Sequence, residues 1–285
     1  MSIQFDLFLH SADVVAENEL REALLARNAS EAQQRLAKLR ARNPDHKALK
    51  PASTMIDALQ AAQPQDSSAA LEQLDRLEQA WAPAAETLFG MDGQNILAPL
   101  WRAAGLALEG VWFDPDQPCR HASRAYLACG DWTSVLRVIQ AEQDCEKQPV
   151  LLERMAQALW QIHRTAQAVE RWFRLCWLAP AYFEKLIKNG HITASLLREH
   201  WNTFINTDME PELTTAWYPA WVLLHEPGLA RSVTGCGAMT GPERAFNLVK
   251  ALLSSDDEQL ALRQELRDLH PGLFHYYLHN RAQLL

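Results

Sequence analysis

Amphipathic helical segments dominate the chain, and patterns typical of β-strands are almost absent. Apolar residues recur at spacings of three and four between breaks of proline, glycine, asparagine or a capping residue. One example is residues 30–42, where Ala32, Leu36 and Leu39 share a helical face before the break at Asn43. This patterning predicts an all-α fold.

Short breaks join many of these helices in pairs. Residues 14–25 and 30–42 are separated by a few residues, as are residues 53–62 and 69–81, which Pro83 follows. Because so short a link leaves two helices side by side and antiparallel, the sequence predicts helical hairpins in tandem.

Two further hairpins lie within residues 116–181 and align with each other. Gly130 and His163 occupy equivalent turn positions 33 residues apart, within the period of helical-hairpin repeats. The four helices are expected at residues 120–129, 134–142, 151–162 and 166–178.

The residues of these two hairpins resemble the tetratricopeptide-repeat pattern. Residues 125–132, AYLACGDW, contain an aromatic residue followed by a Gly-Asp-aromatic turn. In the second copy, Met155-Ala156 is similar to the large–small pair of the family. Ala168 stands where the family's helices cross closely, Trp172 stands at its packing aromatic, and Pro180 stands at its terminal proline.

Three positions depart from the family pattern: His163 replaces the turn glycine, Val135 replaces a close-contact alanine, and Leu175 is larger than usual. The resemblance implies a tetratricopeptide-like α-α superhelix, a right-handed solenoid in which each antiparallel hairpin stacks on the next. We expect this repeat region to cover residues 1–182. Residues 183–285 are expected to form a less regular helical C-terminal block, separate from the solenoid or continuous with it.

In tetratricopeptide proteins the first helix of each hairpin lines a concave partner-binding groove. Carried over to this chain, the resemblance implies a partner-binding set made of Arg120, Arg124, Leu127, Glu153, Gln157 and Trp160. Arg120 and Arg124 are four residues apart and could meet an acidic partner through charge-assisted hydrogen bonds. The alternative is that all six are ordinary solvated side chains.

A dense aromatic cluster, Trp217, Tyr218 and Trp221, surrounds Pro219. Trp217 and Trp221 share a helical face, which favours a place in the core. The alternative is an exposed anchor for a partner, since tryptophan and tyrosine dominate binding hot spots.

Residue patterns that carry chemistry are weak, and we expect no catalytic site, metal or cofactor. His275 and His279 share a face of the last helix, as metal ligands would, but lack an acidic residue of the HExxH kind between them. Cys236 lies in the glycine-rich loop 235–241, and the nearest histidine in sequence is His225. A linker followed by a helix cap explains that loop better than a phosphate-binding loop, because no strand precedes it.

Composition indicates which classes of partner and which cellular compartment are expected. A formal net charge of −8 argues against a generic nucleic-acid binder. Five cysteines without a CxxC pair are expected to be free thiols, which suits a reducing cytoplasm. No apolar stretch approaches the ~20 residues that span a bilayer, so no membrane insertion is expected, and the N-terminus does not have the pattern of a secretory signal.

These observations predict a cytoplasmic, non-catalytic module that binds another protein as an adaptor, chaperone or regulatory scaffold. One alternative is a structural subunit of a larger assembly or a homo-oligomer. The other is an enzyme whose site lies in the C-terminal block around Cys236, His225 and the terminal histidines.

Overall fold

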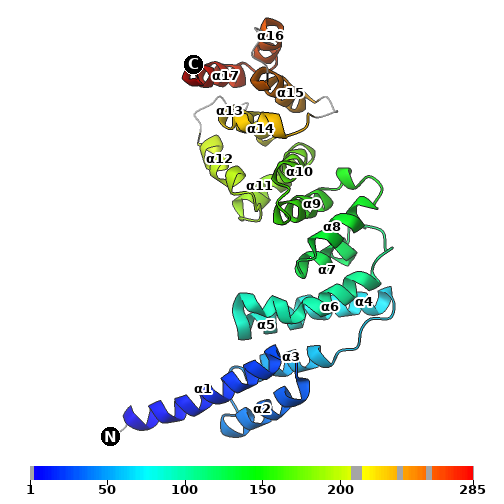
Figure 1. The fold of residues 1–285 in the computed structure, drawn as a ribbon, viewed down its shortest axis with the longest axis vertical. Coiled ribbons are helices and arrows are strands. Elements are labelled where there is room, and N and C mark those ends of the chain that lie inside the picture. The colour runs from blue at the N-terminus through cyan, green and yellow to red at the C-terminus, as the bar shows by residue number, and fades with distance from the viewer. Residues whose placement is uncertain (1–2, 207–213, 236–239, 255–258, 285) are drawn as a thin grey trace. The chain divides into compact units, whose positions relative to one another are not determined.

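The structure is a computed structural model that describes residues 3–206, 214–235, 240–254 and 259–284. These residues form helices joined by turns and loops, without a β-strand, which confirms the all-α prediction (Figure 1). The chain divides into two compact units, Met1–Val138 and Ile139–Leu285. In the part of the chain that the structure describes, no helix is long and apolar enough to cross a bilayer.

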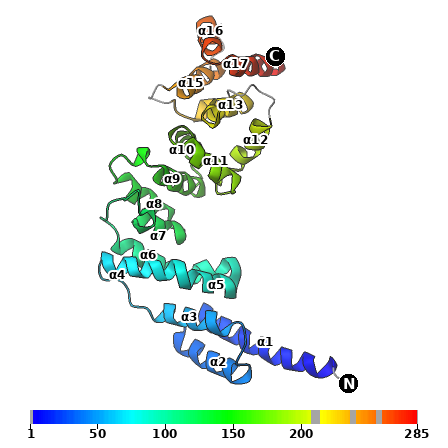
Figure 2. The same cartoon turned by 180° about the vertical axis from the view of Figure 1, so that it is seen from behind.

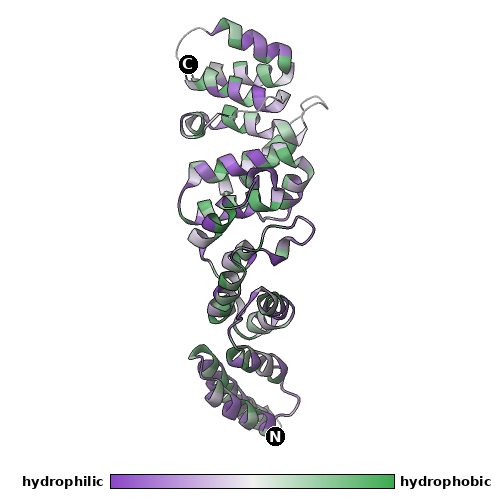
Figure 3. Ribbon diagram, turned by 90° about the vertical axis from the view of Figure 1, so that its right-hand side faces the viewer, coloured by the Kyte–Doolittle hydropathy of each residue, from purple (hydrophilic) through white to green (hydrophobic). Residues whose placement is uncertain are grey.

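Within the first unit, the residues that the structure describes form seven complete helices. They are α1 (Ile3–Leu25), α2 (Ala29–Arg42), α3 (Leu49–Gln60), α4 (Ser67–Arg76), α5 (Ala82–Phe89), α6 (Gly93–Ala107) and α7 (Ala122–Ala128). Helix α1 packs on α2, α2 on α3 and α3 on α5, while both α4 and α5 pack on α6 (Figure 2). Polar and apolar residues are intermixed along the helices, as amphipathic helices require (Figure 3).

The α1–α2 hairpin confirms the first predicted pair of helices. Its turn places Arg27 in the left-handed region at a φ of 56°. The N-cap of α2 is Asn28, whose side chain accepts the N–H of Glu31 at 3.1 Å. The helix therefore begins slightly before residue 30, where its start was expected, because asparagine is as good an N-cap as serine.

A π-helical turn, Leu77–Trp81, joins α4 to α5. Its widened turn buries both Leu77 and Trp81, and the N–H of Ala82 bonds to the carbonyl of Leu77. The expectation that this helix stops before Pro83 is wrong. Proline lacks a backbone N–H, and the first turn of α5, where Pro83 lies, tolerates that loss.

Glycine allows α5 and α6 to approach closely. A Cβ added to Gly93, the first residue of α6, would lie 2.6 Å from the carbonyl oxygen of Ala85. At the other end of α6, a Cβ on Gly105 would lie 3.0 Å from the ring of Tyr126. Both contacts are tighter than ordinary packing permits, so the backbone of α6 is held against its neighbours.

The boundary between the two units, after Val138, lies inside helix α8 (Trp132–Gln140). Within the first unit, the Tyr126 hydroxyl donates to Glu109, and Arg137 bonds to both carboxylate oxygens of Glu109. The Arg137 bond is the largest influence on Glu109 and lowers its carboxyl pKa. This network ties the end of α6 to α7 and α8.

The described residues of the second unit form nine further complete helices. They are α9 (Pro149–Gln161), α10 (Thr165–Leu178), α11 (Pro180–Lys188), α12 (Ser195–Ile205), α13 (Tyr218–His225), α14 (Pro227–Ser232), α15 (Gly241–Ser254), α16 (Leu260–Leu269) and α17 (Pro271–Leu284). Helices α9 and α10 form an intimate pair (Figure 1), α10 contacts α11 and α13, and α13 contacts α15 and α17. The predicted boundary at 182–183 falls inside α11, and one apolar core runs from Leu152 to Tyr277.

The left-handed turn seen at Arg27, in which Asn28 donates its N–H to the carbonyl of Ala23, also ends three further helices. Gly130, His163 and Gly190 have φ values of 71°, 62° and 73°. At each turn the next residue donates its N–H to a carbonyl five residues earlier, as Arg164 does to Leu159 at 2.9 Å. This is the Schellman motif, and it confirms the equivalent turns at 130 and 163.

Candidate functional site

The residues of the predicted groove fall in both units, three in each. In the first unit, Arg120 lies in a short 3-10 turn, because α7 begins only at Ala122 with His121 as its N-cap. Arg120 is exposed, whereas Arg124 and Leu127 on α7 are partly buried.

Arg124 is already bound within the protein. Its Nε lies 2.9 Å from a carboxylate oxygen of Glu78, and its guanidinium carbon lies 5.5 Å from the ring centroid of Trp101. These contacts join α7 to the π-helical turn and to α6. Arg124 therefore positions helices, and an acidic partner would have to compete with Glu78 for it.

Trp101 also borders a small hollow of about 120 Å³ beside α5 and α6. Leu97 and Ala85 form part of its wall, and Met91, with 82% of its surface exposed, stands at its edge. The hollow is smaller than ordinary ligand pockets, which begin at roughly 300 Å³.

In the second unit, α9 brings Glu153, Gln157 and Trp160 to one partly exposed face. Gln157 donates its amide to Glu153 at 3.0 Å, and the hydroxyl of Tyr182 on α11 also donates to Glu153. Burial, and then the bond to Glu153, raise the pKa of Tyr182, which stays a neutral donor. The indole of Trp160 is packed partly against the core.

The aromatic cluster is mainly core. Tyr218 and Trp221 are fully buried, and the Tyr218 hydroxyl donates to the carbonyl of Leu197. Both rings lie near Phe204, at centroid distances of 5.1 and 5.5 Å. Because Tyr218 and Trp221 are not exposed to solvent, only Trp217 of the three could serve as an exposed anchor for a partner. Trp217 is partly buried, and its ring centroid lies 4.5 Å from that of His270.

The histidines form no metal centre among the described residues. His275 and His279 are both exposed on α17, and no cluster of three metal-ligating side chains occurs in the described ranges. His225 stacks on Trp221 at 3.7 Å and bonds through Nδ1 to the Trp221 carbonyl at 3.0 Å. Cys236 lies outside the described residues.

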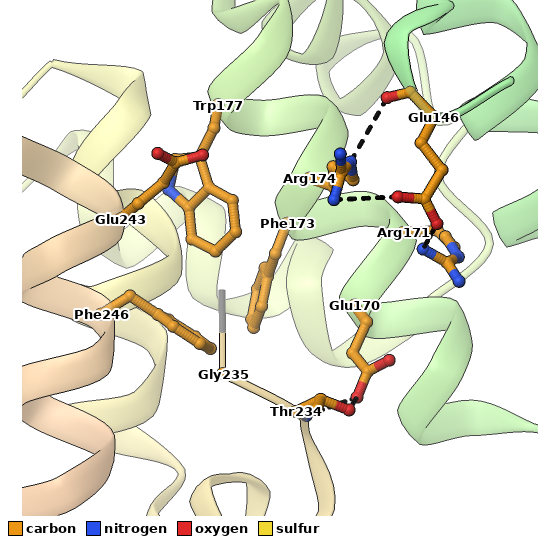
Figure 4. Close-up of a pocket in the computed structure, with 10 residues that line it drawn as sticks. All are labelled: Glu146, Glu170, Arg171, Phe173, Arg174, Trp177, Thr234, Gly235, Glu243 and Phe246. Carbon is orange, nitrogen blue, oxygen red and sulfur yellow. Dashed lines mark hydrogen bonds and ion pairs between the residues drawn. The ribbon is translucent and has the colours of Figure 1, made fainter. Parts of the chain in front are cut away.

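A cavity that the sequence did not indicate lies in the second unit, between α10, α15 and residues 234–235 (Figure 4). It encloses about 250 Å³. Three aromatic side chains line it: Phe173, Trp177 and Phe246. The Phe246 ring meets Phe173 and Trp177 edge to face, at centroid distances of 5.6 and 5.2 Å. Phe173 and Phe246 are almost fully buried, whereas Trp177 keeps part of its surface exposed.

Charged side chains form most of the remaining cavity wall, together with Thr234 and Gly235. Arg171 and Arg174 both bind the carboxylate of Glu146, at 2.7 and 3.0 Å, and Figure 4 shows this cluster set apart from the three rings. Glu170 accepts the hydroxyl of Thr234 at 2.6 Å. Glu243 accepts the N–H and hydroxyl of Thr240, at 3.0 and 2.9 Å, and the bond to the N–H is the one that glutamate makes in a capping box at the start of a helix.

The cavity has only a weak signature in the sequence. On α10, Glu170, Phe173, Arg174 and Trp177 stand at helical spacing, so one face is both aromatic and charged. A helical face with both aromatic and charged side chains is typical of a half-buried surface. The rest of the cavity wall comes from residues 234–246, which are distant from α10 in the sequence, and no local sequence pattern predicts that contact.

No family model matches the chain, and comparisons with curated proteins and with solved structures found no match either.

Proposed function

We propose that this chain is a cytoplasmic, non-catalytic module that binds another protein, and that the partner binds the α9 face formed by Glu153, Gln157 and Trp160. The observation that carries the proposal is the fixed geometry of Glu153. Its two oxygens accept bonds from Gln157 and Tyr182 beside a partly exposed tryptophan.

Such a face has the composition of a binding hot spot. Tryptophan supplies large apolar area at a low cost in conformational entropy, and a carboxylate already held in place loses little freedom when it binds a donor. A partner segment with a basic side chain next to an apolar one would complement this face.

The finer architecture belongs to the same proposal. We propose that the hairpins stack as in tetratricopeptide proteins. Support comes from the shared turns at Gly130 and His163 and from the burial of Ala156, Ala168 and Trp172, at which the sequence resembles that family. In such a stack the first helix of each hairpin would face the partner.

Site-specific photo-cross-linking tests the binding face. A photoreactive amino acid replaces Gln157, and in a matched control it replaces Arg267, an exposed residue of α16. We expect a defined cross-linked protein from position 157 and none from position 267. Adding Trp160→Ala to the first variant should abolish most of the product.

Equal products from positions 157 and 267 would contradict a specific α9 site, as would a product that survives both Trp160→Ala and Glu153→Lys. Circular dichroism of each variant verifies that the helices persist. Sedimentation of the purified chain at several concentrations distinguishes this module from the structural-subunit alternative, whose mass should rise with concentration.

A further inference from the structure

The cavity between α10 and α15 carries an inference that goes beyond the proposed function. We infer that it binds an organic ammonium group, with the positive charge on the indole face of Trp177 and with Glu170 and Glu243 on the surrounding wall of the cavity. The cavity lies wholly within the second unit, and its wall comes from α10, α15, Glu146 and residues 234–235.

The charges of the wall favour a single cation. Arg171 and Arg174 are both held by Glu146, so this cluster keeps one positive charge. Among the described residues, Glu170 and Glu243 accept bonds from the neutral groups of Thr234 and Thr240. The wall as a whole therefore has one uncompensated negative charge, which one ammonium group would neutralise.

The aromatic side chains favour an organic cation over a metal ion. An indole face attracts a cation within about 6 Å of its centroid, and tryptophan is the strongest of the aromatic residues in this respect. Trp177 is the partly exposed ring of the three, while Phe173 and Phe246 support it from within the core. A hard metal ion would require several converging oxygen ligands, and no such cluster occurs among the described residues.

The size of the cavity limits the ligand. A volume of about 250 Å³ is slightly below that of ordinary small-molecule pockets. It suits a compact group such as a quaternary ammonium head or the end of a lysine side chain. The same ammonium chemistry could therefore come from a free metabolite or from a protein.

Isothermal titration calorimetry of the full chain tests the inference with matched probes. Choline is compared with 3,3-dimethylbutan-1-ol, its neutral isostere in which carbon replaces nitrogen. A lysine with its amino and carboxyl termini blocked is compared with norleucine blocked in the same way. We expect at least one cation to bind with a millimolar or lower dissociation constant, and its neutral counterpart to bind at least about ten-fold more weakly. The member that binds identifies the source.

Charge-neutralising variants localise the site. Glu243→Gln keeps the capping box, because glutamine also serves at that position, and Glu170→Gln keeps an oxygen for Thr234. Each should weaken binding of the cation by about ten-fold. Glu199→Gln, an exposed residue of α12, makes the same change in net charge away from the cavity and should bind as the wild type does.

Three results would overturn the inference. They are equal binding of a cation and its neutral counterpart, wild-type affinity in both cavity variants, or no binding of either cation at about 10 mM. Thermal unfolding by circular dichroism verifies that each variant is folded. None of these results depends on cross-linking at α9, so the two proposals fail separately.

Discussion

Arg124 lies over the indole of Trp101, 5.5 Å from the ring centroid, while its Nε lies 2.9 Å from Glu78. One side chain therefore joins α7, α6 and the π-helical turn. Since both partners of the ion pair keep about a third of their surface exposed, solvent screens much of the attraction. The contact of the guanidinium with the Trp101 ring adds a favourable interaction energy that depends less on the ionic strength of the solvent.

The Arg124 contacts predict a modest loss of stability on truncation. Arg124→Ala should lower the free energy of unfolding of the first unit by about 1 kcal/mol, because it removes the ion pair and the cation–π contact together. Urea denaturation followed by circular dichroism measures this change. Arg120→Ala removes the same charge at an exposed position and should change stability by less than about 0.5 kcal/mol. Equal losses in the two variants would mean that the Arg124 contacts contribute nothing measurable.

The turn at His163 predicts a stabilising substitution. His163 has a φ of 62°, a conformation that glycine adopts freely and that costs other residues about 1 kcal/mol. His163→Gly should therefore raise the free energy of unfolding of the second unit by about 0.5–1 kcal/mol. His163→Ala, which relieves no strain, is the control and should give no gain. At the equivalent turn, Gly130→Ala should destabilise the first unit by about 1 kcal/mol. Stabilisation by alanine at 163 would refute the strain argument.

The crossing of α5 and α6 predicts a site intolerant of a methyl group. In Gly93→Ala the new Cβ would meet the backbone of Ala85 at 2.6 Å, so one helix must shift. We expect a loss of about 1–3 kcal/mol in thermal or urea unfolding. Gly228→Ala in α14 adds the same atom where nothing lies within 4 Å and should leave stability unchanged or slightly raised. Similar effects at both positions would show that the close approach does not matter.

Burial of His225 predicts that acid destabilises the second unit. Burial is the main cause that lowers the pKa of His225, and the nearby charge of His200 lowers it further, against the raising effects of the Trp221 carbonyl and Glu226. The ring also faces Tyr276, at a centroid distance of 6.1 Å. The unfolded chain, with a histidine pKa near 6.5, thus binds this proton more readily than the folded chain.

The sign of the pH effect follows from that difference. Stability is present above about pH 6.5 and is lost as the pH falls below it, by at most about 1.4 kcal/mol per pH unit from this group. His225→Phe keeps a ring on Trp221 but cannot titrate, so its urea midpoint should fall less between about pH 7 and 5. His275→Asn, at an exposed histidine, should follow the wild type. An identical slope in His225→Phe and wild type would contradict the prediction.

Local sequence signals predicted the helices and several of their ends. Gly130 adopts the left-handed conformation typical of a helix-ending glycine, and Thr240 with Glu243 opens α15. These features depend on a few adjacent residues, so a single sequence contains them. Tertiary packing overrode local rules elsewhere, as at Pro83, where burial of Leu77 and Trp81 favours continuation of the helix.

The candidate sites could be predicted less well than the fold. The resemblance to tetratricopeptide repeats implied that Glu153, Gln157 and Trp160 share one face of a helix, and the structure places all three on a partly exposed face of α9. The sequence alone could not show that Glu78, more than forty positions before Arg124, binds that arginine. The cavity between α10 and α15 depends on contacts between segments about seventy residues apart, for which the sequence has no periodic signal.

The π-helical turn at Leu77–Trp81 can be understood as one surplus residue in an otherwise continuous helix of α4 and α5. Each residue of an α-helix advances the side chains by about 100° around the axis. Removing one residue there would restore regular winding and rotate everything that follows by that angle. Ala85 would then point away from Gly93. The extra residue thus sets the phase of α5, so a deletion in this turn should be far more damaging than any single substitution within it.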